Sequence, residues 1–487
     1  MGSSLTEDMR FRKSKFTLRC AAAVRVVASV GVVSLFMLGC QRSATAPTPG
    51  SYSIQGTLAL DGGGDPSQAT VRLFAAPQDA MISQTLNDHP SLGFSPIYLS
   101  LFDPLTQSPL NSLNPEQSGY FHFPNLAAET YILDAVLEGY ACAEPLLAVI
   151  STDADVGTLW LSPEEYVSGN LGQAIWDSGK VYRLSGDILI LPEALLTIQQ
   201  NVLILLDGDY TMTVAGGIQI TASPQNPVRF RLSEEHFQVG GDWGGIRIDH
   251  PTNDCVLTGM VIQGAFTALQ VSAGEAQVSE CLFDAPGAYG AYFSANASGT
   301  VMNSIVRDGN NGLVADNSDP QFSQNLILRT SETGVIVKSY SQATLQENAL
   351  LDCETGIWSD WYTSPLIQHN LISGGSRAIE AQTGFTATVR YNVFQGQESE
   401  GIYLYNCYPL IENNNFINMP LNILHVNGNN GQQSDTVFAV YNYWDGEDAT
   451  GIPQRIVDGH DIGSPNNPVG PVEYEPFLLT PVAEAGP

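Results

Sequence analysis

The chain is poor in basic residues for its length of 487 residues, with 19 Lys and Arg against 50 Asp and Glu. The segment 1–39 holds six of the basic and two of the acidic side chains, which leaves 13 and 48, a net charge of −35, for the rest. A surface this acidic repels nucleic acid, anionic lipid and polyanionic substrates. It suits neutral glycans, cations or solubility alone.

Cysteine is also sparse. Beyond residue 40 the cysteines are Cys142, Cys255, Cys281, Cys353 and Cys407. They are odd in number and lack C-x-x-C spacing, so we expect free structural thiols rather than a zinc site or a disulfide framework.

The sequence predicts no cofactor. The one candidate metal site is a calcium site at Asp61-Gly-Gly-Gly-Asp65. Such Gly-Asp clusters between strands are more often turns.

The N-terminus lacks an apolar run long enough for a comfortable membrane span, since Val26 to Leu38 is short. A positive leader precedes it, and Met37-Leu-Gly-Cys40 follows. This pattern resembles the lipobox of bacterial lipoproteins, which implies a signal peptide over 1–39, lipidation of Cys40 and a polar tether over 40–50. Gln41 then favours the outer membrane, facing either the periplasm or the outside. An ordinary secretory signal or an uncleaved anchor are the alternatives.

An asparagine recurs at a nearly constant interval through the C-terminal half. The positions are Asn303, Asn325, Asn348, Asn370, Asn392 and Asn414, with Cys281 and Met260 in the same slot earlier. A fixed period of this length, about 22 residues, predicts a solenoid. Asn tolerates a left-handed turn and bonds local backbone groups, and stacked amides can bond one another.

Each repeat predicts short strands with one buried face, because apolar and polar residues alternate. One inward column is Ala291, Leu313, Val335, Ile357, Ile379, Ile402 and Ile423, and a second is Phe322, Leu345, Ile367, Val389 and Ile411. A single rung cannot bury such a face alone, so neighbouring rungs must stack.

Residues 170–478 resemble the right-handed parallel β-helix proteins of the pectate-lyase-like superfamily. The resemblance is carried by the run from Gly186 to Val202, by Gly241-Asp-Trp-Gly-Gly-Ile246 and by the closing Tyr441-Asn-Tyr-Trp-Asp-Gly446. It implies an all-β chain that ends in a right-handed solenoid with one repeat period per rung, followed by a tail over 479–487.

Residues 51–162 lack the repeat. Seven short strands are expected there, among them Pro96–Phe102, and this number is typical of a β-sandwich. The phrase Ser118-Gly-Tyr-Phe-His-Phe-Pro-Asn-Leu126 and the later Glu138-Gly-Tyr140 resemble the carboxypeptidase regulatory-like (transthyretin-like) family. Glu129 stands where that family has a glycine. The resemblance implies an accessory, non-catalytic module.

Aromatic and polar residues gather on the outward face of the predicted rungs. One outward column is Tyr292, Val314, Ile336, Trp358, Glu380, Tyr403 and Leu424, and the next is Ser294, Asp316, Lys338, Asp360, Gln382, Tyr405 and Val426. Trp361 and Tyr362 lie nearby. Rows of exposed aromatics are unusual on a surface with nothing to bind, and flat rings pack on sugars. Tyr292, Trp358, Trp361, Tyr362, Tyr403 and Tyr405 are therefore candidate carbohydrate contacts, although outward aromatics also stack without a ligand.

Candidate catalytic groups on the same face are Asp316, Lys338, Asp360 and Glu380. Carboxylates one or two rungs apart have the separation, roughly 5–10 Å, that glycoside hydrolysis requires, and Lys338 could stabilise an enolate in a lyase. Lys338 and Asp360 in adjacent rungs could equally form a surface salt bridge. The motif set of polygalacturonases is missing.

Three functions remain open. The first is a membrane-anchored envelope lipoprotein that binds a carbohydrate or cell-surface polymer without catalysis. The second is a polysaccharide lyase or glycoside hydrolase of the β-helix class, and the third is a structural or protein-interaction module. Nucleic acid is not an expected partner, and contact with the membrane is expected only through the lipid.

Overall fold

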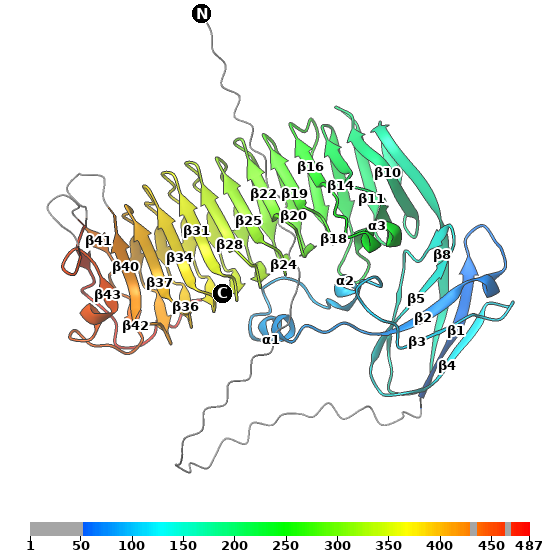
Figure 1. The fold of residues 1–487 in the computed structure, drawn as a ribbon, viewed down its shortest axis with the longest axis horizontal. Helices are drawn as coiled ribbons and strands as arrows, with labels where there is room; N and C mark the ends of the chain where they lie inside the picture. The colour runs from blue at the N-terminus through cyan, green and yellow to red at the C-terminus, as the bar shows by residue number, and fades with distance from the viewer. Residues whose placement is uncertain (1–51, 429–435, 463–468) are drawn as a thin grey trace, which may run out of the picture. The chain divides into compact units, whose positions relative to one another are not determined.

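The computed structural model describes residues 52–428, 436–462 and 469–487. The predicted signal peptide, Cys40 and the tether lie outside these ranges. The described chain is mostly β-structure, with a small N-terminal sheet region followed by a parallel β-solenoid (Figure 1).

The N-terminal region consists of short strands around a small apolar core. β1 (Tyr52–Leu60) pairs with β4 (Tyr120–Leu126) and β8 (Ala154–Leu171). β2 (Thr70–Ala75) pairs with β3 (Asn111–Leu113) and β5 (Thr130–Leu137). β5 pairs in addition with β6 (Tyr140–Ala141) and β7 (Leu146–Val149). Phe121, Phe123 and Leu133 are buried between them. The assignment to the carboxypeptidase regulatory-like family stays a prediction.

An insertion between β2 and β3 replaces one predicted strand by helix. The expectation of a strand at Pro96–Phe102 is wrong, because Tyr98–Leu101 forms the short helix α2. The longer helix α1 (Ala80–Asp88) precedes it and begins at Asp79, whose carboxylate accepts from the backbone N–H groups of Met81 and Ile82. The run 96–102 is apolar because it packs on two sides: Ile97 and Leu101 contact the solenoid, while Phe102 contacts Phe74 and Ile132 of the N-terminal strands. Apolar content alone therefore suggested a strand.

The solenoid has three faces, here called sheets I, II and III, and each turn of the chain passes through them in that order. β8 runs on from the N-terminal region, and together with β10 (Val181–Ile190) it starts both sheet I and sheet II. Sheet I continues with β12 (Leu203–Leu206), β15 (Val228–Leu232), β18 (Met260–Gln263), β21 (Leu282–Asp284), β24 (Ile305–Arg307), β27 (Leu326–Leu328), β30 (Ala349–Leu351), β33 (Leu371–Ser373), β36 (Val393–Gln395), β39 (Asn415–Ile417) and β42 (Tyr443–Trp444).

Sheet II continues with β13 (Thr211–Val214), β16 (Gly245–Asp249), β19 (Thr267–Ser272), β22 (Tyr289–Ser294), β25 (Asn311–Asp316), β28 (Thr333–Lys338), β31 (Thr355–Asp360), β34 (Arg377–Gln382), β37 (Glu400–Tyr405), β40 (Asn422–Asn427) and β43 (Ile456–Val457). Sheet III has 13 strands in the described part of the chain. They are β9 (Ala174–Trp176), β11 (Leu195–Gln199), β14 (Gly217–Thr221), β17 (Cys255–Thr258), β20 (Glu275–Ser279), β23 (Ser298–Met302), β26 (Gln321–Ser323), β29 (Thr344–Gln346), β32 (Leu366–Gln368), β35 (Thr388–Arg390), β38 (Leu410–Glu412), β41 (Val437–Phe438) and β44 (Val472–Glu473). The helix α3 (Glu234–Gln238) and two 3₁₀ turns, η1 (Pro66–Gln68) and η2 (Ile452–Arg455), complete the elements.

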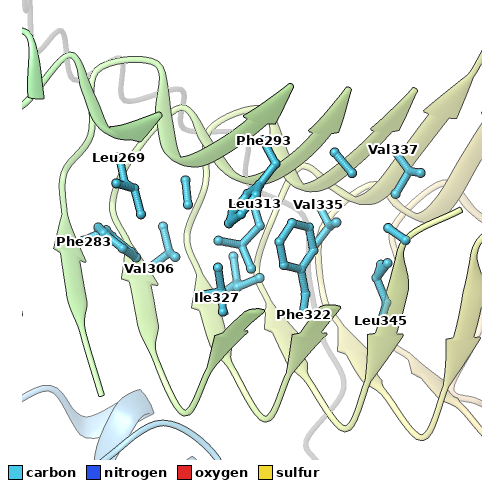
Figure 2. Close-up of a cluster of buried hydrophobic side chains, with 14 of the residues drawn as sticks. Leu269, Phe283, Phe293, Val306, Leu313, Phe322, Ile327, Val335, Val337 and Leu345 are labelled. Carbon is cyan, nitrogen blue, oxygen red and sulfur yellow. The ribbon is translucent and has the colours of Figure 1, made fainter. Parts of the chain in front are cut away.

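One continuous core fills the solenoid. Figure 2 shows side chains of the three sheets meeting inside it, for example Leu313 from sheet II, Ile327 from sheet I and Phe322 from sheet III. The predicted inward columns are confirmed except in the last rung, where Leu424, not Ile423, pairs with Ile402. Ile423 and Leu424 are both fully buried, so their alternation alone did not decide the register.

The asparagine ladder is confirmed from Asn325 to Asn414, and it extends to Asn442. From Asn348 to Asn442, each amide oxygen accepts from the backbone N–H and the side-chain nitrogen of the preceding rung's asparagine, at 2.8–3.0 Å. The placement of Asn303 in the ladder is wrong, because Ser304 holds that slot and donates its backbone N–H to Asn325.

Asn303 instead occupies the left-handed turn position one residue earlier, with φ 45°. In later rungs this position is held by Gln324, Glu347 and His369. The ladder asparagines are therefore not the left-handed residues.

Sheet I is covered on its outside by the insertion. Apolar side chains of the insertion, including Ile82, Leu92 and Leu101, pack against outward residues such as Leu326 and Leu328. Asp79 also pairs with Arg329 at 2.6 Å and with Arg307 at 3.6 Å. Strands of this sheet are consequently apolar on both faces, and outward side chains such as Leu326 and Leu328 are buried under the insertion.

The C-terminal tail runs back along the same side of the solenoid. Val482 and Asn415 exchange two hydrogen bonds, the Gly486 N–H donates to the Tyr391 carbonyl, and the Pro487 carbonyl lies 3.2 Å from a ring nitrogen of His89. The tail therefore joins the solenoid to the end of α1.

Candidate functional site

The outward columns on sheet II are those predicted, apart from the last rung. Strand register places Tyr292, Val314, Ile336, Trp358, Glu380, Tyr403 and His425 in one column. The expectation of outward Leu424 and Val426 is wrong: both point inward, and His425 and Asn427 face out, because the register there is one residue later. Val314 is fully buried despite its column.

A cleft of about 470 Å³ opens over β34, β37 and β40. Its lining combines aromatic rings with charged and polar side chains, namely Arg377, Glu380, Gln382, Glu400, Tyr403, Tyr405 and His425. Three of the predicted site residues, Glu380, Tyr403 and Tyr405, therefore meet in one hollow.

Arg377 organises the charges of this cleft. Its Nε donates to Glu400 at 2.7 Å and its Nη1 donates to Glu380 at 2.8 Å. His425 Nδ1 lies 2.5 Å from the other oxygen of Glu400. Burial opposes ionisation of Glu400, but the hydrogen bonds from His425 and Arg377 outweigh it and lower the pKa of this carboxyl. Glu400 is thus held as a carboxylate.

The tyrosines of the cleft differ in accessibility. The ring of Tyr403 lies 5.0 Å from the Arg377 guanidinium and 5.0 Å, edge to face, from the His425 ring. Asn427 donates to its hydroxyl at 3.4 Å. Tyr405 is 40% exposed and offers the open ring of the pair. The ring of Tyr403, held by its neighbours, and the more exposed ring of Tyr405 together are suited to packing against a flat apolar surface.

A second cluster lies earlier on the same face, around Asp316. The Tyr292 hydroxyl donates to Asp316, and Lys338 Nζ lies 3.3 Å from the same carboxylate. The alternative of a salt bridge between Lys338 and Asp360 is not the one found, since the ion pair of Lys338 is with Asp316. Burial opposes ionisation of Asp316, yet these contacts lower its pKa. Burial and the neighbouring carboxylate raise the pKa of Tyr292 above its usual range.

Exposed aromatics line the turns that follow β28 and β31. Tyr340, Trp361 and Tyr362 are 65%, 58% and 54% exposed. The rings of Tyr340 and Tyr362 stack at 5.7 Å with an interplanar angle of 11°. Tyr362 rests over Gly384, where an added Cβ would lie 2.5 Å from the ring. These turns form an aromatic edge beside sheet II, whereas Trp358 lies half-buried within the sheet between Ile336 and Glu380.

The four candidate catalytic residues do not form one constellation. Asp316 and Lys338 pair with each other, Asp360 accepts from the Trp361 backbone N–H at 2.7 Å, and Glu380 is held by Arg377. A glycosidase needs a carboxylic acid with a raised pKa as proton donor. Asp316 and Glu400, by contrast, both have lowered pKa values.

Sequence reasoning missed Arg377, Glu400 and His425. The first two belong to a third outward column that precedes the small residue of each rung, and this column pairs Thr355, Arg377, Glu400 and Asn422. The predicted outward columns began after the small residue of each rung, so this column was not among them. His425 was missed through the register error.

The comparisons with known proteins agree with the fold. A model of the family described as "Right handed beta helix region" matches residues 216–358 and 266–418. That stretch of the chain is a right-handed β-helix region. No curated protein and no solved structure matches the chain.

The calcium candidate has other contacts. Asp61 pairs with Lys180 at 2.5 Å, and Asp65 accepts from the Ser67 backbone and hydroxyl. Among the described residues, no group of three or more His, Cys, Asp or Glu side chains is placed to hold a metal. Nor does this part of the chain contain a helix of the length and apolarity that a membrane crossing demands.

All five described cysteines are free and buried, which confirms the expectation of structural thiols.

Proposed function

We propose that sheet II is a carbohydrate-binding face and that its cleft over β34, β37 and β40 is the principal contact. The observation that supports this most is the meeting of Tyr403, Tyr405 and an ion-paired polar set in one open hollow. Tyrosine rings pack on the apolar faces of sugars, while Glu380, Gln382 and Arg377 offer acceptors and donors to hydroxyl groups.

The proposed ligand is a neutral glycan, and the proposed role is binding without catalysis. The cleft holds Glu380 and Glu400 against Arg377, and the whole chain has a formal charge of −31, so a uronate polymer would be repelled. Glu400, whose pKa is lowered despite burial by its hydrogen bonds from His425 and Arg377, is also a poor proton donor, which disfavours hydrolysis.

An array of neutral oligosaccharides tests the proposal. Tyr405→Ala removes the open ring and is expected to weaken binding roughly 5- to 30-fold, which corresponds to about 1–2 kcal/mol. Phe438→Ala is the matched control, since Phe438 is 51% exposed on sheet III of the same solenoid. Absence of binding to every neutral glycan, or equal losses in the two variants, would refute it. Release of reducing ends or of unsaturated products would instead show an enzyme.

We also propose that the protein is anchored in the cell envelope, in the outer membrane, through a lipid on Cys40. The support is the sequence Met37-Leu-Gly-Cys40 after a positive leader and a short apolar run. Mass spectrometry of the purified protein should find a diacylglyceryl group on Cys40, and Cys40→Ser should release the protein from membranes. An unmodified Cys40, or unchanged fractionation of the variant, would contradict the anchor.

A further inference from the structure

A second hollow, separate from the sheet II cleft, lies where the insertion crosses the first part of sheet I. It measures about 350 Å³. Asp103 and Leu105 come from the insertion, Phe237 from α3, Leu232 from β15, Gln263 from β18 and Asp284 from β21. Its volume falls within the range of small-molecule sites, about 300–1,000 Å³, near the lower limit.

The walls of this pocket are largely apolar. Leu232 is 5% exposed, and Phe237 is 38% exposed. The backbone at Gly264, with φ 65°, passes close to Leu232, so that an added Cβ would lie 3.1 Å from that side chain. An apolar hollow with a half-exposed aromatic ring favours a ligand with an apolar body.

Two buried polar side chains in the lining have acceptor oxygens without a partner. Gln263 is 5% exposed; its Nε2 donates to Asp284 at 3.4 Å, whereas its Oε1 has no hydrogen-bond donor among the described residues. Asp103 is 8% exposed, and its Oδ1 accepts from the Leu105 backbone N–H at 2.9 Å. Its Oδ2 accepts no hydrogen bond within the described ranges. Buried polar atoms are normally paired, so an unpaired acceptor in a pocket calls for a donor.

The charge of the pocket adds to this demand. The two oxygens of Asp284 accept from Arg307 at 2.8 and 3.0 Å, so this carboxylate is already neutralised. Asp103 forms no ion pair within the described residues, although the positive charge of Arg231 opposes the rise of its pKa. Burial raises the pKa of Asp103, which is the response of a carboxyl that lacks a close counter-charge.

We propose that this pocket binds a small, apolar molecule that carries a protonated amine, with the amine directed to Asp103 and Gln263. The amine supplies several hydrogen-bond donors and a positive charge, whereas an alcohol supplies one donor and an anion supplies none. The apolar body lies between Leu105, Leu232 and Phe237. This site is independent of the carbohydrate face, because none of its residues lines the sheet II cleft.

Calorimetric titration of the purified full-length protein tests the site with three probes of similar shape. The probes are 2-phenylethylamine, 2-phenylethanol and 3-phenylpropionate. We expect saturable binding of the amine, binding of the alcohol at least about fivefold weaker, and no binding of the anion. Saturable binding of the anion in preference to the amine, or binding of none of the three, would overturn the proposal.

Three variants locate the binding. Asp103→Asn keeps the size of the side chain and should weaken the amine about tenfold while leaving the alcohol little changed. Phe237→Ala should weaken amine and alcohol alike. Asp254→Asn, at an exposed aspartate outside the pocket, is the control and should change neither. An amine affinity that is the same in all three variants would place the binding elsewhere, and circular dichroism verifies that each variant is folded.

Discussion

Substitution of the ladder residue Asn370 should destabilise the protein more than substitution of Asn303, which has the spacing of a ladder residue but lies outside the ladder. Asn370 is fully buried and forms five hydrogen bonds through its side chain. It accepts twice from Asn348, and it donates to the carbonyls of Leu345 and Gln368 and to the Asn392 side chain, each at 2.9 Å. Its loss also leaves the buried Asn348 backbone N–H without this acceptor.

The expected magnitude follows from these bonds. Each contributes about 1 kcal/mol net, so Asn370→Ala should lower the free energy of unfolding by about 3–5 kcal/mol after partial relaxation. Asn303 donates one hydrogen bond, to the Ser91 carbonyl at 2.7 Å, from a partly exposed position. Asn303→Ala loses this bond and places alanine at a left-handed φ of 45°, so it should cost about 1–2 kcal/mol, still less than Asn370→Ala.

Urea unfolding followed by far-ultraviolet circular dichroism measures both values side by side. Stacked repeats can unfold in stages, so the first loss of signal is compared as well as the midpoint. The reasoning is refuted if Asn303→Ala costs as much as Asn370→Ala, or if Asn370→Ala leaves the transition unchanged.

Three further predictions concern charge and thiol burial. Burial raises the pKa of Asp103 in the folded state, so its contribution to stability is full below about pH 3.8 and is lost as pH rises through the folded pKa. Asp103→Asn should therefore raise the melting temperature at neutral pH and change it little near pH 3.5. A lower melting temperature at neutral pH would contradict this. For Asp79, burial raises the pKa, but the contacts to Arg329 and the Ile82 backbone N–H lower it overall. The stability that ionised Asp79 contributes is thus present above about pH 3.8 and lost as the pH falls below it. Asp79→Asn should speed proteolysis of residues 76–110 at neutral pH. An unchanged cleavage rate would show that the ion pairs do not hold the insertion. Burial raises the pKa of Cys281 and Cys407 to about 12 and that of Cys255 to about 11. These thiols should therefore react with a disulfide reagent only after the protein unfolds. Rapid reaction of the native protein would show that they are accessible.

The sequence predicted the solenoid because its signal is repeated in every rung. Register errors do not accumulate where each rung offers a small residue followed by an inward apolar one, as Gly356 and Ile357 do. They occur where the pattern is doubled or shifted. Ile423 and Leu424 are two consecutive buried residues, and Asn303 precedes the serine that holds the ladder slot.

The cover of sheet I could not be derived from the repeat. Leu326 and Leu328 flank Ile327 and are buried on the outside only because the insertion lies over them. Their apolarity indicates that something covers the sheet, but not what does so. The insertion that covers them lies between β2 and β3, far earlier in the chain, and no local pattern connects the two.

The candidate site was predicted in part for a similar reason. Tyr403, Tyr405 and Glu380 were found because they stand in regular columns of the repeat. Arg377 and Glu400 were missed because they lie before the small residue of the rung, where the chain also faces outward. That Arg377 bridges two carboxylates depends on side-chain conformations, which spacing does not determine.

Hydrogen–deuterium exchange, with and without a neutral glycan that binds on the array, tests the carbohydrate face most directly. Sheet II is the predicted contact, so exchange should slow in β34 and β37, over Arg377–Gln382 and Glu400–Tyr405, and stay unchanged in β35 and β38 of sheet III. Slower exchange confined to Thr388–Arg390 and Leu410–Glu412 would put the ligand on the opposite strands and contradict the account.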